Sequence, residues 1–275
     1  MKKLFAILYA TIISICPFAV FTTYQNNIPD VPKIYAETDI TPYGGTPLDV
    51  IEEQIDYSHK VVDKYYNPYE LPHYLSSYTC GISAGGEIIG FYDRIYDELI
   101  PNHTGRIFLG KYLYAPQDDE VNKMYDILNT LMNATSEGVT INNFINGVKS
   151  YVNSKGRSAS FKSAIKNNSL DFNTYKQAIL SNKLISIFAD GFNIIQTFDF
   201  EEHDHYDYLT IYRNNGAHIM VAYGYYDVKY YDTQSRCFRH DNYLYVSTGV
   251  SIPALALLRI NQYCTVDDAY ITEII

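Results

Sequence analysis

The chain has 275 residues, of which 47% are hydrophobic and 19% are charged, a composition typical of a folded protein with one large or two small domains. Its formal net charge is -10, and its lysines and arginines form no cluster. Because phosphate backbones are bound by grouped basic side chains, this composition excludes a nucleic-acid partner.

The first 36 residues predict export. Met1-Lys2-Lys3 precedes an apolar run from Leu4 to Phe21, the order of regions found in secretory signals. We therefore interpret residues 1–36 as a signal peptide or N-terminal anchor and predict a secreted or cell-surface protein. The apolar run has about the length that spans a bilayer, so we expect contact with a membrane only through this segment, if it stays uncleaved.

Residues 37–71 predict either a short N-terminal or pro-segment or the first helix of the domain that follows. Turn-forming residues occupy positions 41–47. The apolar residues that follow recur in a helical spacing, at Val50, Ile51, Ile55, Val61 and Val62. We expect the main domain to begin at Pro72 and to extend to residue 275.

A cysteine lies at the predicted start of a buried helix. Residues 78–93 read YTCGISAGGEIIGFYD, and the helical spacing of their apolar positions places Cys80 in the first turn. There, unpaired backbone N–H groups and the helix dipole favour a thiolate, so Cys80 is a candidate nucleophile. The alternative is a small apolar cysteine at the edge of the core. Glycines at positions 85, 86 and 90 predict that a sheet packs closely against this helix.

Helices dominate the predicted first half and strands the second. Helical spacing recurs over residues 121–131, 141–152 and 172–180, and a buried strand is predicted at 184–189. Strands are predicted beyond residue 206, at 208–212, 217–226, 243–247, 257–261 and 269–275, with a hairpin turn at Asn214-Asn215-Gly216. This order predicts an α+β fold with two lobes, a helical first lobe and an antiparallel β second lobe, and a groove between them.

The second candidate for chemistry is His218, near the predicted start of strand 217–226. The strand is almost continuously apolar, so an imidazole there needs a partner; the alternative to a functional role is a core-edge histidine bonded to a carbonyl. His218 lies 138 residues after Cys80, within the interval of about 130 to 150 residues between nucleophile and base in papain-type enzymes. In such a pair the imidazole takes the thiol proton and the thiolate attacks a peptide carbonyl.

The chain resembles the papain-like cysteine peptidase superfamily, particularly its bacterial bacteriocin-processing and staphopain-like branches. The matching pieces are Thr79-Cys80-Gly81 before a helix ending in Phe91-Tyr92-Asp93, Ala217-His218-Ile219 before Gly224-Tyr225, and the strand at 242–246. The resemblance covers about residues 71–275. It implies the two-lobed fold, a peptidase domain at 72–275, cleavage of peptide or protein substrates without a cofactor or metal, Cys80 as nucleophile and His218 as base.

One departure from the family concerns the group that orients the imidazole. Family members usually place an Asn or Asp where the strand register here places Thr248. A threonine hydroxyl can accept the ring N–H, so Thr248 is our predicted third catalytic residue. Asp227, Asp241 and Asn242 are nearby substitutes.

The other departure concerns the oxyanion hole. Residues 74–79 contain no Gln or Asn, which leaves the Cys80 backbone N–H together with a hydroxyl of Ser76, Ser77 or Tyr78. Three hypotheses follow: a secreted or surface cysteine peptidase, a catalytically weak or inactive peptide-binding surface protein, and a cell-wall amidase or acyl transferase that uses the same pair.

Two further stretches contain residues that could bind a metal ion or form a disulfide. The sequence EEHDHYD at 201–207 has its histidines only two residues apart before a predicted strand, which favours a solvated acidic loop over a zinc site. Cys237 and Cys264 could pair across two late strands, although spacing alone does not fix the geometry.

Overall fold

Antiparallel strands dominate the computed structural model, which describes residues 46–72, 74, 79–136, 138–249, 255–260 and 265–275. Strands account for 48% and helices for 25% of these residues. They all belong to one unit, whose bounds are Asp39–Ile275. The helices are α2 (Cys80–Asp93), α3 (Asp119–Leu131), α4 (Ile141–Ser154), α5 (Phe172–Leu180) and the 3-10 turn η1 (Thr197–Asp199).

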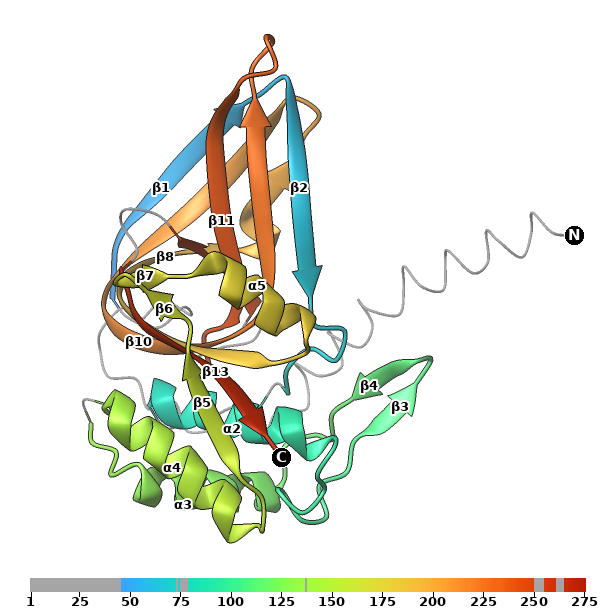
Figure 1. Ribbon diagram of the computed structural model, residues 1–275, viewed down its shortest axis with the longest axis vertical. Coiled ribbons are helices and arrows are strands. Elements are labelled where there is room, and N and C mark those ends of the chain that lie inside the picture. Colours follow the sequence, from blue (N-terminus) through green and yellow to red (C-terminus); the bar gives the residue numbers. More distant parts are fainter. Residues whose placement is uncertain (1–45, 73, 75–78, 137, 250–254, 261–264) are drawn as a thin grey trace, which may run out of the picture. The chain divides into compact units, whose positions relative to one another are not determined.

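A nine-stranded sheet forms the centre of the described structure (Figure 1). Its strands are β1 (Thr46–Asp56), β2 (His59–Tyr66), β5 (Ala159–Ser163), β8 (Leu184–Gln196), β9 (Phe200–Glu202), β10 (Tyr206–Tyr231), β11 (Cys237–Ser247), β12 (Leu255–Ile260) and β13 (Thr265–Ile274). Two small hairpins, β3 (Arg106–Phe108) with β4 (Lys111–Leu113) and β6 (Ile165–Lys166) with β7 (Ser169–Leu170), lie outside it.

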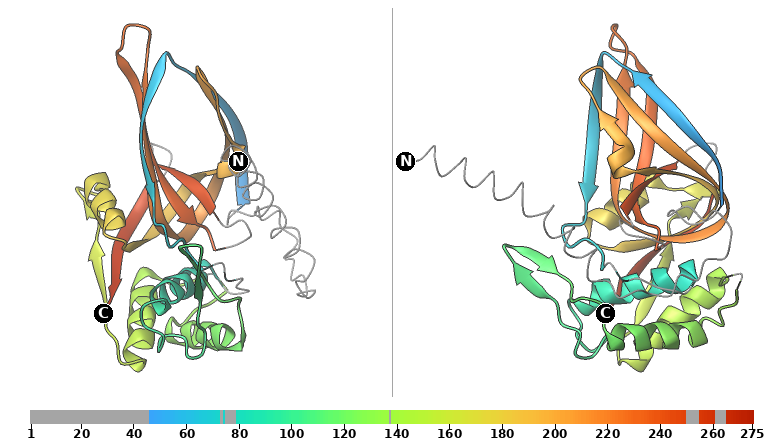
Figure 2. Two further views of the ribbon diagram at one scale, coloured as in Figure 1. Left: turned by 90° about the vertical axis from the view of Figure 1, so that its right-hand side faces the viewer. Right: turned by 180° about the vertical axis from the view of Figure 1, so that it is seen from behind.

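The 26-residue strand β10 organises this sheet. Its first part pairs with β1 on one edge and with β9 and β8 on the other, and its second part pairs with β11 and β2. Because β11 pairs with β12 and β12 with β8, the path from β10 through these strands returns to β10 and closes a ring. The helices α2, α3 and α4 gather beside one end of the sheet (Figures 1 and 2).

The predicted hairpin turn at residues 214–216 is wrong. The chain does not reverse there: residues on both sides belong to β10 and pair with the same neighbour, β8, with a register shift between Asn214 and Ala217. Gly216 has φ +116°, a conformation that a glycine adopts readily, so residues typical of a turn form a bulge within one strand. His218 therefore lies inside a long strand, close to this bulge.

The helix predicted from the spacing of Val50 to Val62 is also wrong, since this segment forms β1 and β2. Along β1 the more buried positions alternate, at Ile51, Glu53, Ile55 and then Tyr57 just beyond its end, which is the period of a strand. This strand period is not visible in the sequence, because one of the inward-facing positions is Glu53 and a carboxylate is not expected on a buried face.

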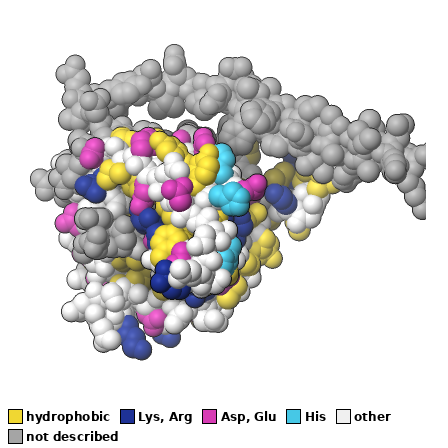
Figure 3. Space-filling view, turned by 90° about the horizontal axis from the view of Figure 1, so that it is seen from above, with side chains coloured by type: hydrophobic (Ala, Val, Ile, Leu, Met, Phe, Trp, Pro, Cys, Tyr) yellow, Lys and Arg dark blue, Asp and Glu magenta, His cyan; other side chains and the backbone are white. Residues whose placement is uncertain are grey.

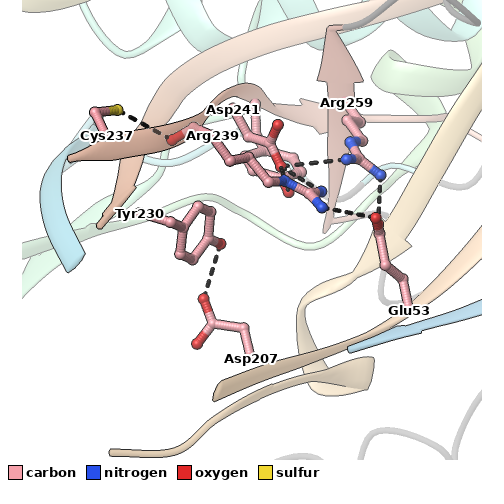
Figure 4. Close-up of polar contacts among 8 residues, drawn as sticks. Glu53, Asp207, Tyr230, Cys237, Arg239, Asp241 and Arg259 are labelled. Carbon is pink, nitrogen blue, oxygen red and sulfur yellow. Dashed lines mark hydrogen bonds and ion pairs between the residues drawn. The ribbon is translucent and has the colours of Figure 1, made fainter. Parts of the chain in front are cut away.

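Glu53 occupies this face because two arginines neutralise it. It accepts hydrogen bonds from Arg239 on β11 and Arg259 on β12, both at 2.7 Å (Figure 4). Asp241 binds the same two guanidinium groups. The four charged side chains join β1 to strands almost 200 residues later in the chain. Such a network cannot be predicted from the spacing of residues within β1.

These strands overturn the predicted fold class. The α+β papain-like architecture, with a helical first lobe and a separate β lobe, is wrong, because the described residues are mostly antiparallel sheet with four α-helices. Strands β1 and β2, which precede α2, pair with β10 in the sheet that also holds the last strands. Long strand edges must be paired or covered, and β1 and β2 pair with those of β10.

The helices predicted after residue 120 are confirmed as α3, α4 and α5. Each is preceded by a residue whose side chain accepts a backbone N–H of the first turn: Asp118, Thr140 and Asp171. The predicted strand at 184–189 forms the first half of β8, and the late strands form β11, β12 and β13.

Helix α2 is buried from Gly81 to Asp93, as a central helix requires. A Cβ atom at Gly86 would lie 2.3 Å from the ring of Tyr125 on α3, and one at Gly90 would lie 2.5 Å from the ring of Tyr74. The close approach predicted from these glycines is therefore confirmed, but α3 and Tyr74 occupy the space that we had expected a sheet to fill.

Candidate functional site

Cys80 is the first residue of α2. The preceding Thr79 has extended backbone angles, and its carbonyl accepts the N–H groups of Ile82 and Ser83, so the helix begins at the cysteine. The N–H groups of a helix's first turn have no intrahelical partner. The Cys80 thiol is half-buried at the edge of the helical core, with the N–H group of Gly81 beside it.

Gly81 lets strand β10 approach this thiol. A Cβ atom at position 81 would lie 2.2 Å from Cγ2 of Val139 and 3.1 Å from Cδ1 of Ile219. Ile219 directly follows His218, so the missing side chain at Gly81 brings the histidine to the start of α2. The sheet thus approaches α2 closely at Gly81, and not at the three later glycines from which the approach was predicted.

The structure brings Cys80 and His218 together. Burial raises the pKa of the Cys80 thiol, but its hydrogen bond with the His218 side chain and the charge of that ring lower the pKa. The backbone N–H groups of Ile219 and Gly81 lower it further, and the balance leaves the pKa below its ordinary value. The surroundings of Cys80 thus favour a thiolate, as expected of a nucleophile.

A main-chain carbonyl fixes the orientation of His218. Its Nε2 lies 2.8 Å from the carbonyl oxygen of Thr248, and its ring stacks on Phe192 with 5.6 Å between centroids. Since a carbonyl can only accept, Nε2 carries the hydrogen and Nδ1 keeps the lone pair. The neutral ring is therefore held in the tautomer whose Nδ1 can take a proton.

Thr248 lies where the strand register places it, but it reaches His218 through its backbone oxygen and not through its hydroxyl. The substitutes named from the sequence are engaged elsewhere. Asp227 forms ion pairs with basic side chains of α5 and β11, Asp241 binds two arginines, and Asn242 pairs with Asp227 in the β10–β11 register. The Thr248 carbonyl can orient the ring as an acceptor. Because it is neutral, it stabilises an imidazolium less than a carboxylate does.

The sequence analysis did not identify Glu87, which lies two turns after Cys80 on α2. Its carboxyl is buried, accepts a 2.6 Å hydrogen bond from the Ser247 hydroxyl, and has no partner at Oε2 among the described residues. Burial raises the pKa of Glu87 to about 8, against the smaller opposite effect of the Ser247 hydroxyl. Ser247 precedes Thr248, so a buried acid on α2 holds the strand end that orients His218. The signal for Glu87 in the sequence was a carboxylate in the middle of a mostly apolar helix.

The predicted oxyanion hydroxyls of Ser76, Ser77 and Tyr78 lie outside the described residues. The Cys80 backbone N–H remains the predicted donor, in the first turn of α2.

Within the described residues, no three His, Cys, Asp or Glu side chains form a group that could hold a metal ion. The acidic stretch at 201–207 is solvated at Glu201 to His205, but Asp207 is fully buried, contrary to our prediction. Its carboxylate accepts hydrogen bonds from Lys60 at 2.8 Å, Tyr57 at 3.0 Å and Tyr230 at 2.8 Å (Figure 4 shows Tyr230). It thus joins β2 to β10.

Two other predictions fall partly outside the described residues. Cys237 is exposed and free, whereas Cys264 is not described. The export segment is not described either. Across the described part of the chain, no helix has the length and apolar character needed to cross a bilayer.

No family model, curated protein or solved structure matches this chain. Its function must therefore be argued from the site.

Proposed function

We propose that the protein is an exported cysteine hydrolase that cleaves peptide bonds, with Cys80 as nucleophile and His218 as general base. One observation supports this most directly: the thiol at the start of α2 lies beside the His218 imidazole, which lowers its pKa, and Nε2 of that ring is fixed by the Thr248 carbonyl. We retain only the Cys–His chemistry of the papain-like resemblance, because the fold predicted with it is wrong.

In this proposal His218 Nδ1 takes the proton of the Cys80 thiol, and Sγ attacks the carbonyl carbon of the substrate. The oxygen of the tetrahedral intermediate receives a hydrogen bond from the Cys80 backbone N–H. The imidazolium then protonates the leaving amine, which gives a thioester on Cys80. Water attacks the thioester with His218 again as base, and this releases the carboxylic acid and regenerates the thiol.

The site has a weaker means of stabilising the imidazolium than a Cys–His–Asn or Cys–His–Asp triad has. The Thr248 carbonyl offers a neutral acceptor, and the structure describes no carboxylate or amide side chain bonded to His218. We therefore expect slower turnover than in enzymes with such a third residue. Secretion remains part of the proposal, based on the apolar run that follows Lys3.

The test compares alkylation of two cysteines in the same protein. Iodoacetamide is added between pH 5 and pH 7, and labelling of Cys80 and of the exposed Cys237 is followed by peptide mass spectrometry. We expect Cys80 to react at least about tenfold faster at pH 5.5, since only an ion-paired thiolate persists there. His218→Gln removes the proton acceptor and should abolish this advantage without changing the labelling of Cys237.

Substrate class is tested with casein and peptidoglycan, using Cys80→Ala as the control. Cys80-dependent turnover of casein supports the peptidase, whereas turnover of peptidoglycan alone supports the predicted amidase. If Cys80 reacts rapidly but neither substrate is cleaved, the inactive peptide-binding alternative replaces the proposal. Alkylation of Cys80 no faster than of Cys237 at pH 5.5 would refute the proposed ion pair itself.

A further inference from the structure

The β3–β4 hairpin presents an apolar tip. Its register pairs Arg106 with Leu113 and Phe108 with Lys111, and the two residues between the strands are Leu109 and Gly110. Both turn residues have positive φ, +49° and +78°, as two-residue hairpin turns of this kind require. In Figures 1 and 2 the hairpin extends away from the sheet and from α2, α3 and α4.

Three consecutive apolar side chains cover this tip. Ile107 is 76% exposed, Phe108 57% and Leu109 85%. Asn, Asp and Gly are the usual residues at the first position of such a turn, because a left-handed conformation is unfavourable for a branched apolar residue. The chain instead places a leucine there, fully presented to solvent.

The base of the hairpin is attached to the body of the protein. The Tyr114 hydroxyl donates to the carbonyl of Glu70 at 3.4 Å, and the rings of Tyr112 and Tyr114 contact edge to face with 5.0 Å between centroids. A Cβ atom at Gly105 would lie 2.5 Å from the Tyr112 hydroxyl, so the two chain segments at the base pack closely. The tip is therefore held out from the surface on an ordered support.

The charges of the hairpin oppose those of the rest of the chain. The protein carries 31 acidic residues and a net charge of -10, yet residues 99–117 contain no Asp or Glu. Arg106 and Lys111 flank the tip and are exposed. On the face seen in Figure 3, by contrast, acidic, basic and apolar side chains are interspersed. The hairpin thus combines an apolar tip with a local positive charge.

We propose that the β3–β4 hairpin inserts its tip into the interface of an anionic lipid bilayer. Ile107, Phe108 and Leu109 enter the boundary between headgroups and acyl chains, and Arg106 and Lys111 bind the headgroups. Tyr112 and Tyr114 lie behind the tip, at the level where aromatic residues are enriched at membrane surfaces. Three strand residues extend about 10 Å, which matches the depth of about 5 to 10 Å that interfacial segments reach.

The convex form of the tip favours lipid over a protein partner. Two short strands and a turn present Ile107, Phe108, Leu109 and Leu113 on a projecting hairpin (Figure 1), in place of the recessed surface that a peptide segment needs. A fluid bilayer adapts to such a tip without a complementary pocket, and the positive flanks match its anionic surface. This contact is independent of the predicted N-terminal anchor and of the chemistry at Cys80.

The chain contains no tryptophan, so a single introduced tryptophan reports on its own surroundings. Phe108→Trp places the reporter at the tip, and Phe238→Trp, at a phenylalanine that is 52% exposed on β11, is the matched control. The full-length protein is mixed with vesicles of phosphatidylglycerol or of phosphatidylcholine that contain brominated acyl chains. Fluorescence quenching then shows which site meets the acyl region, even if the N-terminal segment also binds the vesicles.

We expect quenching and a blue shift for Trp at position 108 with phosphatidylglycerol, and neither for Trp at position 238. Arg106→Gln with Lys111→Gln in the reporter protein should raise the lipid concentration for half-maximal quenching about 25-fold, since each cation near an anionic surface contributes about fivefold. The same pair of changes should have little effect with phosphatidylcholine.

Absence of quenching at position 108 overturns the proposal, as does equal quenching at positions 108 and 238. A blue shift at position 108 that requires no vesicles and grows with protein concentration would identify a second copy of the chain as the occupant instead of lipid. Either result leaves the proposed Cys80 chemistry unaffected, because alkylation of Cys80 is measured without vesicles.

Discussion

Replacing Glu87 by glutamine should make the protein more stable at alkaline pH and leave its stability at acidic pH almost unchanged. The Glu87 carboxyl is buried on α2 and stays protonated in the folded protein up to a pKa of about 8. Its ordinary pKa is 4.5, so the unfolded chain releases this proton at much lower pH. Glutamine resembles the protonated acid in size and polarity, and its carbonyl can accept the Ser247 hydroxyl.

The sign follows from the difference in bound protons. Below pH 4.5 both states are protonated and the group contributes no pH dependence; above it, the unfolded chain alone gains by ionising, until the folded carboxyl also ionises near pH 8. The raised pKa thus corresponds to about 5 kcal/mol of unfolding free energy, lost as the pH rises, of which roughly 3 to 4 kcal/mol falls between pH 5 and pH 8. Folded domains have about 5 to 15 kcal/mol in total, so the loss is large.

The assay is urea unfolding followed by circular dichroism at pH 5, 6.5 and 8. Asp93 is a second buried acid, whose pKa burial raises to about 7, so the wild-type curve alone does not isolate Glu87. The quantity to compare is the difference between Glu87→Gln and wild type at each pH. Ser247→Ala is the matched control, because it removes the hydrogen bond to Glu87 but keeps the carboxyl and its pH dependence. A difference that stays constant within about 1 kcal/mol from pH 5 to pH 8 would show that Glu87 ionises normally and that our reasoning is wrong.

Two further substitutions test how the site is assembled. Thr248→Ala should leave the alkylation rate of Cys80 within about twofold of wild type, because the carbonyl that binds His218 Nε2 is part of the backbone; a tenfold loss would mean that the hydroxyl holds the ring. Gly81→Ala should destabilise the protein by about 1 to 3 kcal/mol and slow alkylation at pH 5.5, since the new Cβ would meet Val139 at 2.2 Å. Adding Val139→Ala should restore both properties, and failure to restore either would show that the Val139 contact does not limit the approach of β10.

The sequence by itself determined the elements whose residues repeat locally. The helices α3, α4 and α5 have apolar residues at helical spacing and a side chain that caps the first turn, so their positions can be predicted without knowledge of distant contacts. The start of α2 at Cys80 was also predicted, from helical spacing alone, since the side chain of Thr79 makes no capping hydrogen bond. The pairing of Cys80 with His218 could also be predicted, because Cys80 lies at a helix start, His218 lies near a strand start, and 138 residues separate them.

The strands β1 and β2 and the course of β10 depend on tertiary structure, because distant residues determine which charges are neutralised and which strand edges are paired. Glu53 can face inward on β1 only because Arg239 and Arg259, from strands late in the chain, neutralise its charge. In the sequence, where these partners cannot be seen, the apolar residues around Glu53 have a spacing that resembles a helix. Residues 214–216 look like a hairpin turn, but β8 pairs with β10 both before and after them, and the chain continues as one strand.

The same distinction applies within the site. The strand register placed Thr248 near His218, but whether its hydroxyl or its carbonyl binds the ring depends on how β11 ends against α2. That end is held by Ser247 and Glu87, whose 2.6 Å hydrogen bond joins residues 160 positions apart. A buried acid that stays neutral in the fold looks like any other glutamate in the sequence, because its pKa is set by burial, and burial exists only once the chain is folded.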